Sequence, residues 1–122
     1  MELISTTNKH PVQITALAAE TCYASYGKHI DKENEYVKKV IKSGHTSVME
    51  HWWATFLIGH DEFMQSPYAV ADIINKPGVI YIENNNGAYV TLNWRHLYEI
   101  KHNFFILKMI ELIEQNAYVR LQ

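Results

Sequence analysis

The segment VIYIENNNGAYVTLN, residues 79–93, is the part of this chain that most limits how it can fold. Two runs rich in β-branched and aromatic residues flank the pair Asn86-Gly87. That arrangement is the strongest short-range signal for a β-hairpin, because asparagine and glycine accept the backbone angles of a tight turn. The sequence therefore predicts an antiparallel pair of strands here.

Two further segments predict strands. The N-terminal letters MELIS are typical of a short edge strand. The run WWATFLI, which begins at Trp52, is rich in aromatic and apolar residues and predicts a buried strand that contributes to the core and to a subunit interface. The hairpin and these two runs predict a small antiparallel sheet.

Two helices are expected between these strands. The run HPVQITALAAETCYAS has Pro11 at the first helical position and places Val12, Ala16 and Ala19 on one face. The run DKENEYVKKVIKSG is amphipathic, with Asp31 expected as the N-cap and Gly44 as the stop.

Two more helices are expected later in the chain. The run SPYAVADIINKPG predicts a short helix that Ser66 caps and Pro77-Gly78 close. From Trp94 to about Leu121 the pattern predicts one long C-terminal helix. Its apolar residues occupy more than one face, which in so small a protein favours a homo-oligomer. The fold class that follows is α+β, a small antiparallel sheet packed on helices.

Composition limits the cellular and chemical setting. The 122 residues fit a single domain, 1–122, and the formal net charge of −2 gives no reason to expect nucleic acid or an anionic membrane as a partner. The single cysteine, Cys22, fits a reducing compartment, and no signal peptide or membrane span is recognisable. We expect a cytoplasmic protein.

The turn GHTSVME, residues 44–50, admits two interpretations that are compatible. Ser47 and Glu50 have the spacing of a capping box, in which serine and glutamate side chains bond to backbone N–H groups at a helix start. Alternatively, the segment from Gly44 to Ser47 presents free N–H groups to a phosphate.

The remaining histidines and the cysteine give no signal of a metal site or a nucleophile. His45 and His51 are six residues apart, with His60 further on, and this spacing fits no common zinc motif, so we expect no metal site. Cys22 lies near the end of a helix, facing apolar residues, and is expected to be a small core residue rather than a nucleophile.

The run NWRHL, residues 93–97, stands where the hairpin meets the next helix. Asn93 is an ordinary N-cap residue, and Arg95 could be merely solvated. Yet Arg95 is the only arginine apart from Arg120 near the C-terminus, and the start of a helix attracts anions. A contact from Arg95 to a phosphate or a ribose is the alternative interpretation.

Three stretches in the same order resemble the flavin-dependent thymidylate synthases, the ThyX family. They are MELISTTNKHPVQITALAAETCYASY, VKKVIKSGHTSVMEHWWATFLIG and TLNWRHL, and they cover about half of the chain. The block Gly-His-x-Ser-x-x-Glu-His is the specific one.

The resemblance implies a homotetramer, with a dimer as second choice, in which FAD lies where subunits meet. Members methylate dUMP using FAD, NADPH and methylenetetrahydrofolate. By resemblance His45 would lie beside the flavin, Ser47 and Glu50 would contact FAD, and Asn93 and Arg95 would belong to the same cofactor site.

The chain departs from the family pattern on the substrate side. The Arg-His-Arg and serine signature that binds dUMP should follow the Phe-rich strand, but HDEFMQSPYAVADIINKPG contains no arginine. Phe104 occupies the position of a further dUMP-binding arginine, and Lys108 that of a histidine near the flavin. A phosphate loses several charge-assisted hydrogen bonds without these groups, so we expect no catalytic residues for dUMP methylation.

Three functions are compatible with this pattern. The first is a non-catalytic protein that binds FAD or another ADP-containing or cyclic nucleotide between subunits and senses or sequesters it. The second is a minimal flavoenzyme, either a residual synthase or an NAD(P)H oxidase. The third is a structural subunit that pairs with a full-length homologue.

Overall fold

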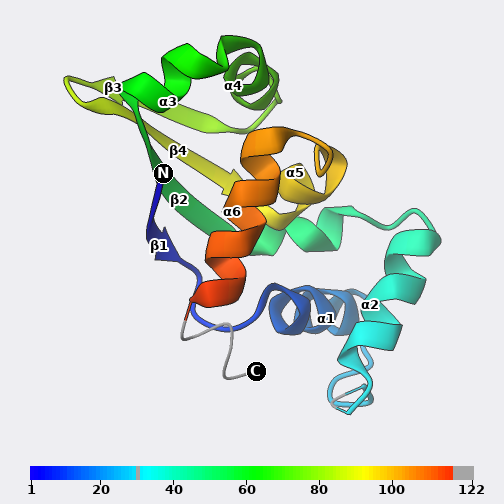
Figure 1. Ribbon diagram of the computed structural model, residues 1–122. Helices are drawn as coiled ribbons and strands as arrows, with labels where there is room; N and C mark the ends of the chain where they lie inside the picture. The colour runs from blue at the N-terminus through cyan, green and yellow to red at the C-terminus, as the bar shows by residue number, and fades with distance from the viewer. Residues whose placement is uncertain (30, 117–122) are drawn as a thin grey trace.

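The computed structural model describes residues 1–29 and 31–116, in which one four-stranded antiparallel sheet packs against helices (Figure 1). The α+β class and the small antiparallel sheet are therefore confirmed. In chain order the elements are β1 (Glu2–Thr6), α1 (Pro11–Cys22), α2 (Glu33–Lys42), the 3₁₀ helix η1 (Ser47–His51), β2 (Trp53–Gly59), α3 (His60–Gln65), α4 (Pro67–Ile74), β3 (Ile80–Asn84), β4 (Gly87–Asn93), α5 (Trp94–Glu99) and α6 (Phe104–Gln115).

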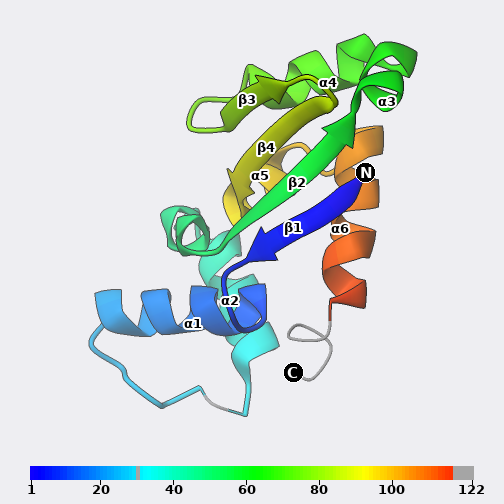
Figure 2. The same cartoon turned by 90° about the vertical axis from the view of Figure 1, so that its left-hand side faces the viewer.

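The strands follow the order β1-β2-β4-β3, so β1 and β3 form the edges (Figure 2). The predicted edge strand at the N-terminus is confirmed. The hairpin is also confirmed, but its turn is Asn85-Asn86 instead of the expected Asn86-Gly87, because Asn84 pairs with Gly87. Gly87 has φ +151°, and a Cβ at this position would lie 2.1 Å from the carbonyl oxygen of Ile58. Glycine is therefore required where the hairpin closes onto β2.

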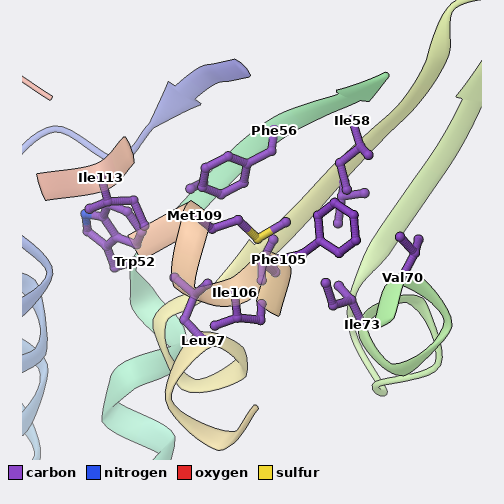
Figure 3. Close-up of a cluster of buried hydrophobic side chains, with 13 residues drawn as sticks. Trp52, Phe56, Ile58, Val70, Ile73, Leu97, Phe105, Ile106, Met109 and Ile113 are labelled. Carbon is purple, nitrogen blue, oxygen red and sulfur yellow. The ribbon is translucent and has the colours of Figure 1, made fainter. Parts of the chain in front are cut away.

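Strand β2 is half-buried in strict alternation, because its even-numbered residues face the core. The sheet lies in front of α5 and α6 in Figure 2, so the helices cover only one of its faces. The core between them contains Trp52, Phe56 and Ile58 from the β2 segment, which meet Phe105 and Met109 of α6 (Figure 3).

A second, smaller cluster holds α1 and α2 to η1. Its buried members are Ala19, Val40, Val48 and Met49. Trp94, at the start of α5, packs against both this cluster and the main core. The turn that follows α2 is thereby fixed to the end of the sheet.

The expected single helix from Trp94 to about Leu121 is wrong in one respect, because the chain leaves helical geometry between Glu99 and Phe104. Asn103 starts α6 by accepting hydrogen bonds from the N–H groups of Phe105, at 2.9 Å, and Ile106, at 3.4 Å. Its side-chain amide also donates to the carbonyl of Ala69 at 2.8 Å. This cap and the tertiary bond outweigh the helical pattern of the sequence. Residues 117–122 of the predicted helix lie outside the described residues.

Two local expectations were also wrong, and one helix was missed. Helix α2 begins at Glu33 and its N-cap is Lys32 instead of Asp31. Residues 60–65 form α3, which the apolar pattern did not predict. Cys22 is exposed, although Ala19 and Glu20 in the same last turn of α1 are buried. Within residues 1–29 and 31–116, none of the helices has the length and apolar character needed to cross a membrane.

Candidate functional site

His45 is positioned by the way α2 ends. The N–H of Gly44 bonds to the carbonyl of Ile41 at 2.9 Å, and the N–H of His45 bonds to that of Val40 at 3.3 Å. These two bonds make a Schellman motif, which needs a left-handed residue at its centre. Gly44 supplies it with φ +93°, so the predicted glycine stop is confirmed.

The His45 ring is also held by Tyr23, the residue that follows α1. The hydroxyl of Tyr23 lies 2.9 Å from Nδ1 of His45. The two rings meet edge to face, with centroids 5.5 Å apart. An imidazole fixed by a hydrogen bond at one nitrogen presents the other in a defined direction. Tyr23 could not be identified as a partner of His45 from the sequence, because no motif relates the two residues.

Backbone N–H groups of the 44–47 turn are mostly committed to the protein itself. Those of Gly44, His45 and Thr46 bond to the carbonyls of Ile41, Val40 and Gly44. The expectation of free donors for a phosphate is therefore wrong at three of the four positions. A ligand at this turn would therefore be held mainly by side chains.

The Ser47–Glu50 capping box is not formed. Thr46 occupies the N-cap position of η1, and no side-chain cap bond is made there. The Glu50 carboxylate instead turns towards Arg95, whose Nη1 donates to Oε2 at 3.3 Å. The ion pair outcompetes the capping bond, because it satisfies a guanidinium as well as a carboxylate.

Asn93 makes the reciprocal cap that Ser47 does not. Its Oδ1 accepts from the N–H of His96 at 2.9 Å, and its own N–H donates to Nδ1 of His96 at 3.0 Å. Since Nδ1 accepts, the proton of a neutral His96 is on Nε2, which donates to the carbonyl of Pro77 at 2.8 Å. The predicted N-cap at Asn93 is confirmed, and His96 is the partner that the sequence did not reveal.

These two caps give a testable contrast. Ser47→Ala should change the free energy of unfolding by less than about 0.5 kcal/mol, since Ser47 is exposed and caps nothing. Asn93→Ala should lower it by about 0.5–2 kcal/mol, since the N–H of His96 loses its acceptor. Urea unfolding of both variants measures the difference. Equal losses in the two variants would contradict the observed cap assignment.

Glu50 and Arg95, which are 45 residues apart in sequence, form the centre of the candidate site. Their side chains are 43% and 34% exposed, so the pair is open to solvent. Glu99 approaches from the other side, with Oε2 at 3.6 Å from Nε of Arg95. The i, i+4 spacing of Arg95 and Glu99 is a helical signal that the sequence contained.

The chemistry of this group fits a ribose phosphate. A guanidinium donates in a fork that matches phosphate oxygens, and a carboxylate accepts from ribose hydroxyls. Two carboxylates beside one guanidinium would repel a phosphate, so binding requires the Glu50–Arg95 pair to open. These residues could hold the nucleotide part of FAD, with Glu50 on hydroxyls and Arg95 on phosphate.

The residues that replace the family's substrate-side signature form a different cluster. Glu62 on α3 is paired with the amino group of Met1, and Lys108 lies 3.7 Å from its Oε2. Burial favours a raised pKa for Glu62, but the ammonium of Met1, the Gly59 N–H and Lys108 prevail and lower the pKa. The Lys108 ammonium also lies 5.8 Å from the centre of the Phe104 ring. This cluster sets one carboxylate between two ammonium groups and offers no guanidinium.

The five predicted site residues thus fall into two groups. Glu50 and Arg95 meet where η1 contacts the start of α5, whereas Asn93 is buried at that helix start and bonds to His96. His45 contacts Tyr23, and no hydrogen bond or ion pair joins His45 or Ser47 to the first group within the described part of the chain. One turn, Gly44–Glu50, connects both groups.

Comparison with known proteins gives one family. The family model described as "Thymidylate synthase complementing protein" matches residues 2–65, just over half of the 122 residues. No curated protein and no solved structure matches the chain. The matched range includes β1, α1, α2, η1 and β2, and it ends with α3. This chain belongs to the thymidylate synthase complementing protein family, the ThyX family.

Proposed function

We propose that this chain is a non-catalytic nucleotide-binding member of its family. It holds FAD, or another ADP-containing or cyclic nucleotide, and acts by sequestering or sensing that ligand. The Glu50–Arg95 pair carries the proposal, because it joins the family's two cofactor-side motifs in one exposed place. Both side chains are partly exposed, so a ligand can reach them. Their bond to each other can then be replaced by bonds to the ligand.

Loss of the synthase reaction follows from the charges that remain. Arg95 is the only arginine among the described residues, and by family resemblance it belongs to the cofactor site and not to the substrate site. The α3 segment presents the paired Glu62, and α6 presents Phe104 and Lys108. A dUMP phosphate would lose two or more charge-assisted bonds, each of about 1.5–3 kcal/mol.

A homo-oligomer completes the proposal, with a tetramer first and a dimer second. Helix α6 buries Phe105, Ile106, Met109 and Ile113 in the core, yet Phe104 and Leu107 remain 57% and 56% exposed. Apolar side chains of this size on a helix are typical of surfaces that subunits cover. The nucleotide would lie between subunits and be closed in by a second copy.

The proposal predicts no conversion of dUMP to dTMP by the purified protein supplied with FAD, NADPH and methylenetetrahydrofolate. The reason is the missing guanidinium set around the substrate phosphate. Chromatographic detection of dTMP measures the activity, and a full-length family enzyme in the same buffer is the positive control. Complementation of a thymidine-requiring bacterial strain by this chain would overturn the non-catalytic assignment.

A minimal flavoenzyme is the second candidate, and family membership favours it. Such a protein would keep flavin and either residual synthase activity or NAD(P)H oxidase activity. Oxidation of NADPH, followed at its absorbance maximum in the presence of FAD and oxygen, distinguishes the flavoenzyme from the non-catalytic binding protein. A rate above that of free FAD would favour the flavoenzyme.

A further inference from the structure

A hollow of about 410 Å³ lies beside α2, at the His45 end of the Gly44–Glu50 turn. Its volume is within the range of small-molecule sites. Tyr23, His29 and Tyr36 contribute rings to its lining, and Lys32 and Lys39 contribute ammonium groups. Glu35 is the one carboxylate among the lining residues.

The rings of this hollow are pre-arranged. His29 stacks on Tyr36 with centroids 3.6 Å apart and planes 4° from parallel. The N–H of His29 reaches the buried carboxylate of Glu20 at 3.4 Å, which anchors the loop that carries the imidazole. Tyr23 is held by its 2.9 Å bond to His45 while its side chain stays 55% exposed. An exposed, oriented ring is a stacking surface for a base.

The ammonium groups of the hollow are available to an anion. Lys39 lies three residues after Tyr36 on α2, and Lys32, the N-cap of that helix, lies four residues before it, so both lysines flank the Tyr36 ring. No carboxylate of the described residues lies within 4.0 Å of either ammonium, whereas Lys76 and Lys108 both have such partners. Two lysines against Glu35 leave a lining charge of +1 when His29 is neutral.

We infer that this hollow is the base-and-phosphate subsite for the nucleotide of the proposed function, on which the inference rests. A planar base stacks on Tyr23, and a phosphate pairs with Lys39 and Lys32. The ligand class is a nucleotide that carries an anionic phosphate near its base, rather than a free nucleoside or a free phosphate. Glu50 and Arg95 at the other end of the turn contact ribose hydroxyls and phosphate of the same ligand.

The test is calorimetric titration with ADP, the fragment common to FAD and other ADP-containing ligands, beside adenosine and inorganic phosphate as separate probes. ADP should bind more tightly than either fragment. Tyr23→Leu should weaken ADP binding about 5-fold or more through lost stacking. Lys39→Ala should weaken it about 2- to 5-fold, as expected for an exposed charge pair, and the effect should shrink at high salt.

Two variants serve as controls. Lys38→Ala removes the same charge from α2 outside the hollow and should leave ADP affinity unchanged. Tyr23→Phe keeps the ring and loses only the bond to His45, so it should retain most of the affinity. Circular dichroism of each variant checks that α1 and α2 remain folded.

The outcomes separate this inference from the proposed function. ADP binding that is lost in Arg95→Ala but unchanged in both Tyr23→Leu and Lys39→Ala would overturn the subsite and leave the proposed function standing. Equal weakening by Lys38→Ala and Lys39→Ala would also overturn it, since only overall charge would then matter. No binding of ADP, FAD or a cyclic nucleotide by the unaltered protein would overturn both.

Discussion

Trp52→Ala is expected to lower the free energy of unfolding by about 3–5 kcal/mol. Trp52 is fully buried, and its ring lies 5.8 Å from that of Trp94, edge to face. Its indole N–H donates to the carbonyl of Lys9 at 3.0 Å. Lys9 has φ +96°, which a side-chain-bearing residue rarely adopts, so this bond helps to hold a strained turn. Truncation removes the packing and the donor together.

Chemical denaturation followed by circular dichroism measures the Trp52 effect. Trp52→Phe is the matched control, since it keeps an aromatic ring and loses the N–H, and it should cost less than the alanine variant. A loss below about 1 kcal/mol in Trp52→Ala would contradict the arrangement of the core shown in Figure 3.

Arg95→Ala is expected to weaken nucleotide binding by about 1.5–3 kcal/mol, or roughly 10- to 150-fold. Arg95 is the only guanidinium at the site, and no other described residue can replace its fork on a phosphate. Stability should change little, because the Arg95 side chain is 34% exposed and its ion pair with Glu50, which is 43% exposed, is accessible to water. Affinity and stability therefore respond differently to this variant.

Calorimetric titration with FAD and with ADP measures the Arg95 effect. Arg95→Lys is the control variant, since it keeps the charge but not the fork, and it should recover only part of the affinity. Unchanged affinity in a folded Arg95→Ala protein would show that the nucleotide binds elsewhere. The hairpin tip at Asn84–Gly87 with Tyr81 and Tyr89 would then be the next place to test.

The sheet was predictable because its signals are local. A hairpin turn, an alternating strand and a short edge strand each occupy fewer than about ten residues, and each depends on neighbouring side chains. Gly44 was predictable for the same reason, since a left-handed residue at a helix end strongly favours glycine. The cap at Asn93 is equally local.

The errors arose where distant groups compete with local ones. The chain leaves helical geometry before Asn103, which reaches the carbonyl of Ala69 on another helix. The Ser47–Glu50 spacing predicted a cap, but Arg95 draws the Glu50 carboxylate away. Cys22 is exposed although Ala19 in the same turn is buried against Val40, Val48 and Met49, so burial at this helix end depends on packing with α2 and η1. None of these partners is near in sequence.

The candidate site, too, could be predicted from the sequence only in part. The residues of each motif could be named from the sequence, and the family resemblance put them in one cofactor site. Their partners Tyr23, His96 and Glu99, and the hollow beside α2, depend on the tertiary structure. That Arg95 meets Glu50 is likewise a property of the fold, since α5 packs against η1.

The most direct test of the nucleotide-binding account is the ultraviolet–visible spectrum and mass of the small molecule released when the purified protein is denatured. The protein should first be incubated with FAD and with a cell nucleotide extract and then freed of unbound ligand. The account predicts a stoichiometric nucleotide, seen as a flavin spectrum or as the mass of another ADP-containing or cyclic nucleotide. Release of no nucleotide after either incubation would contradict it.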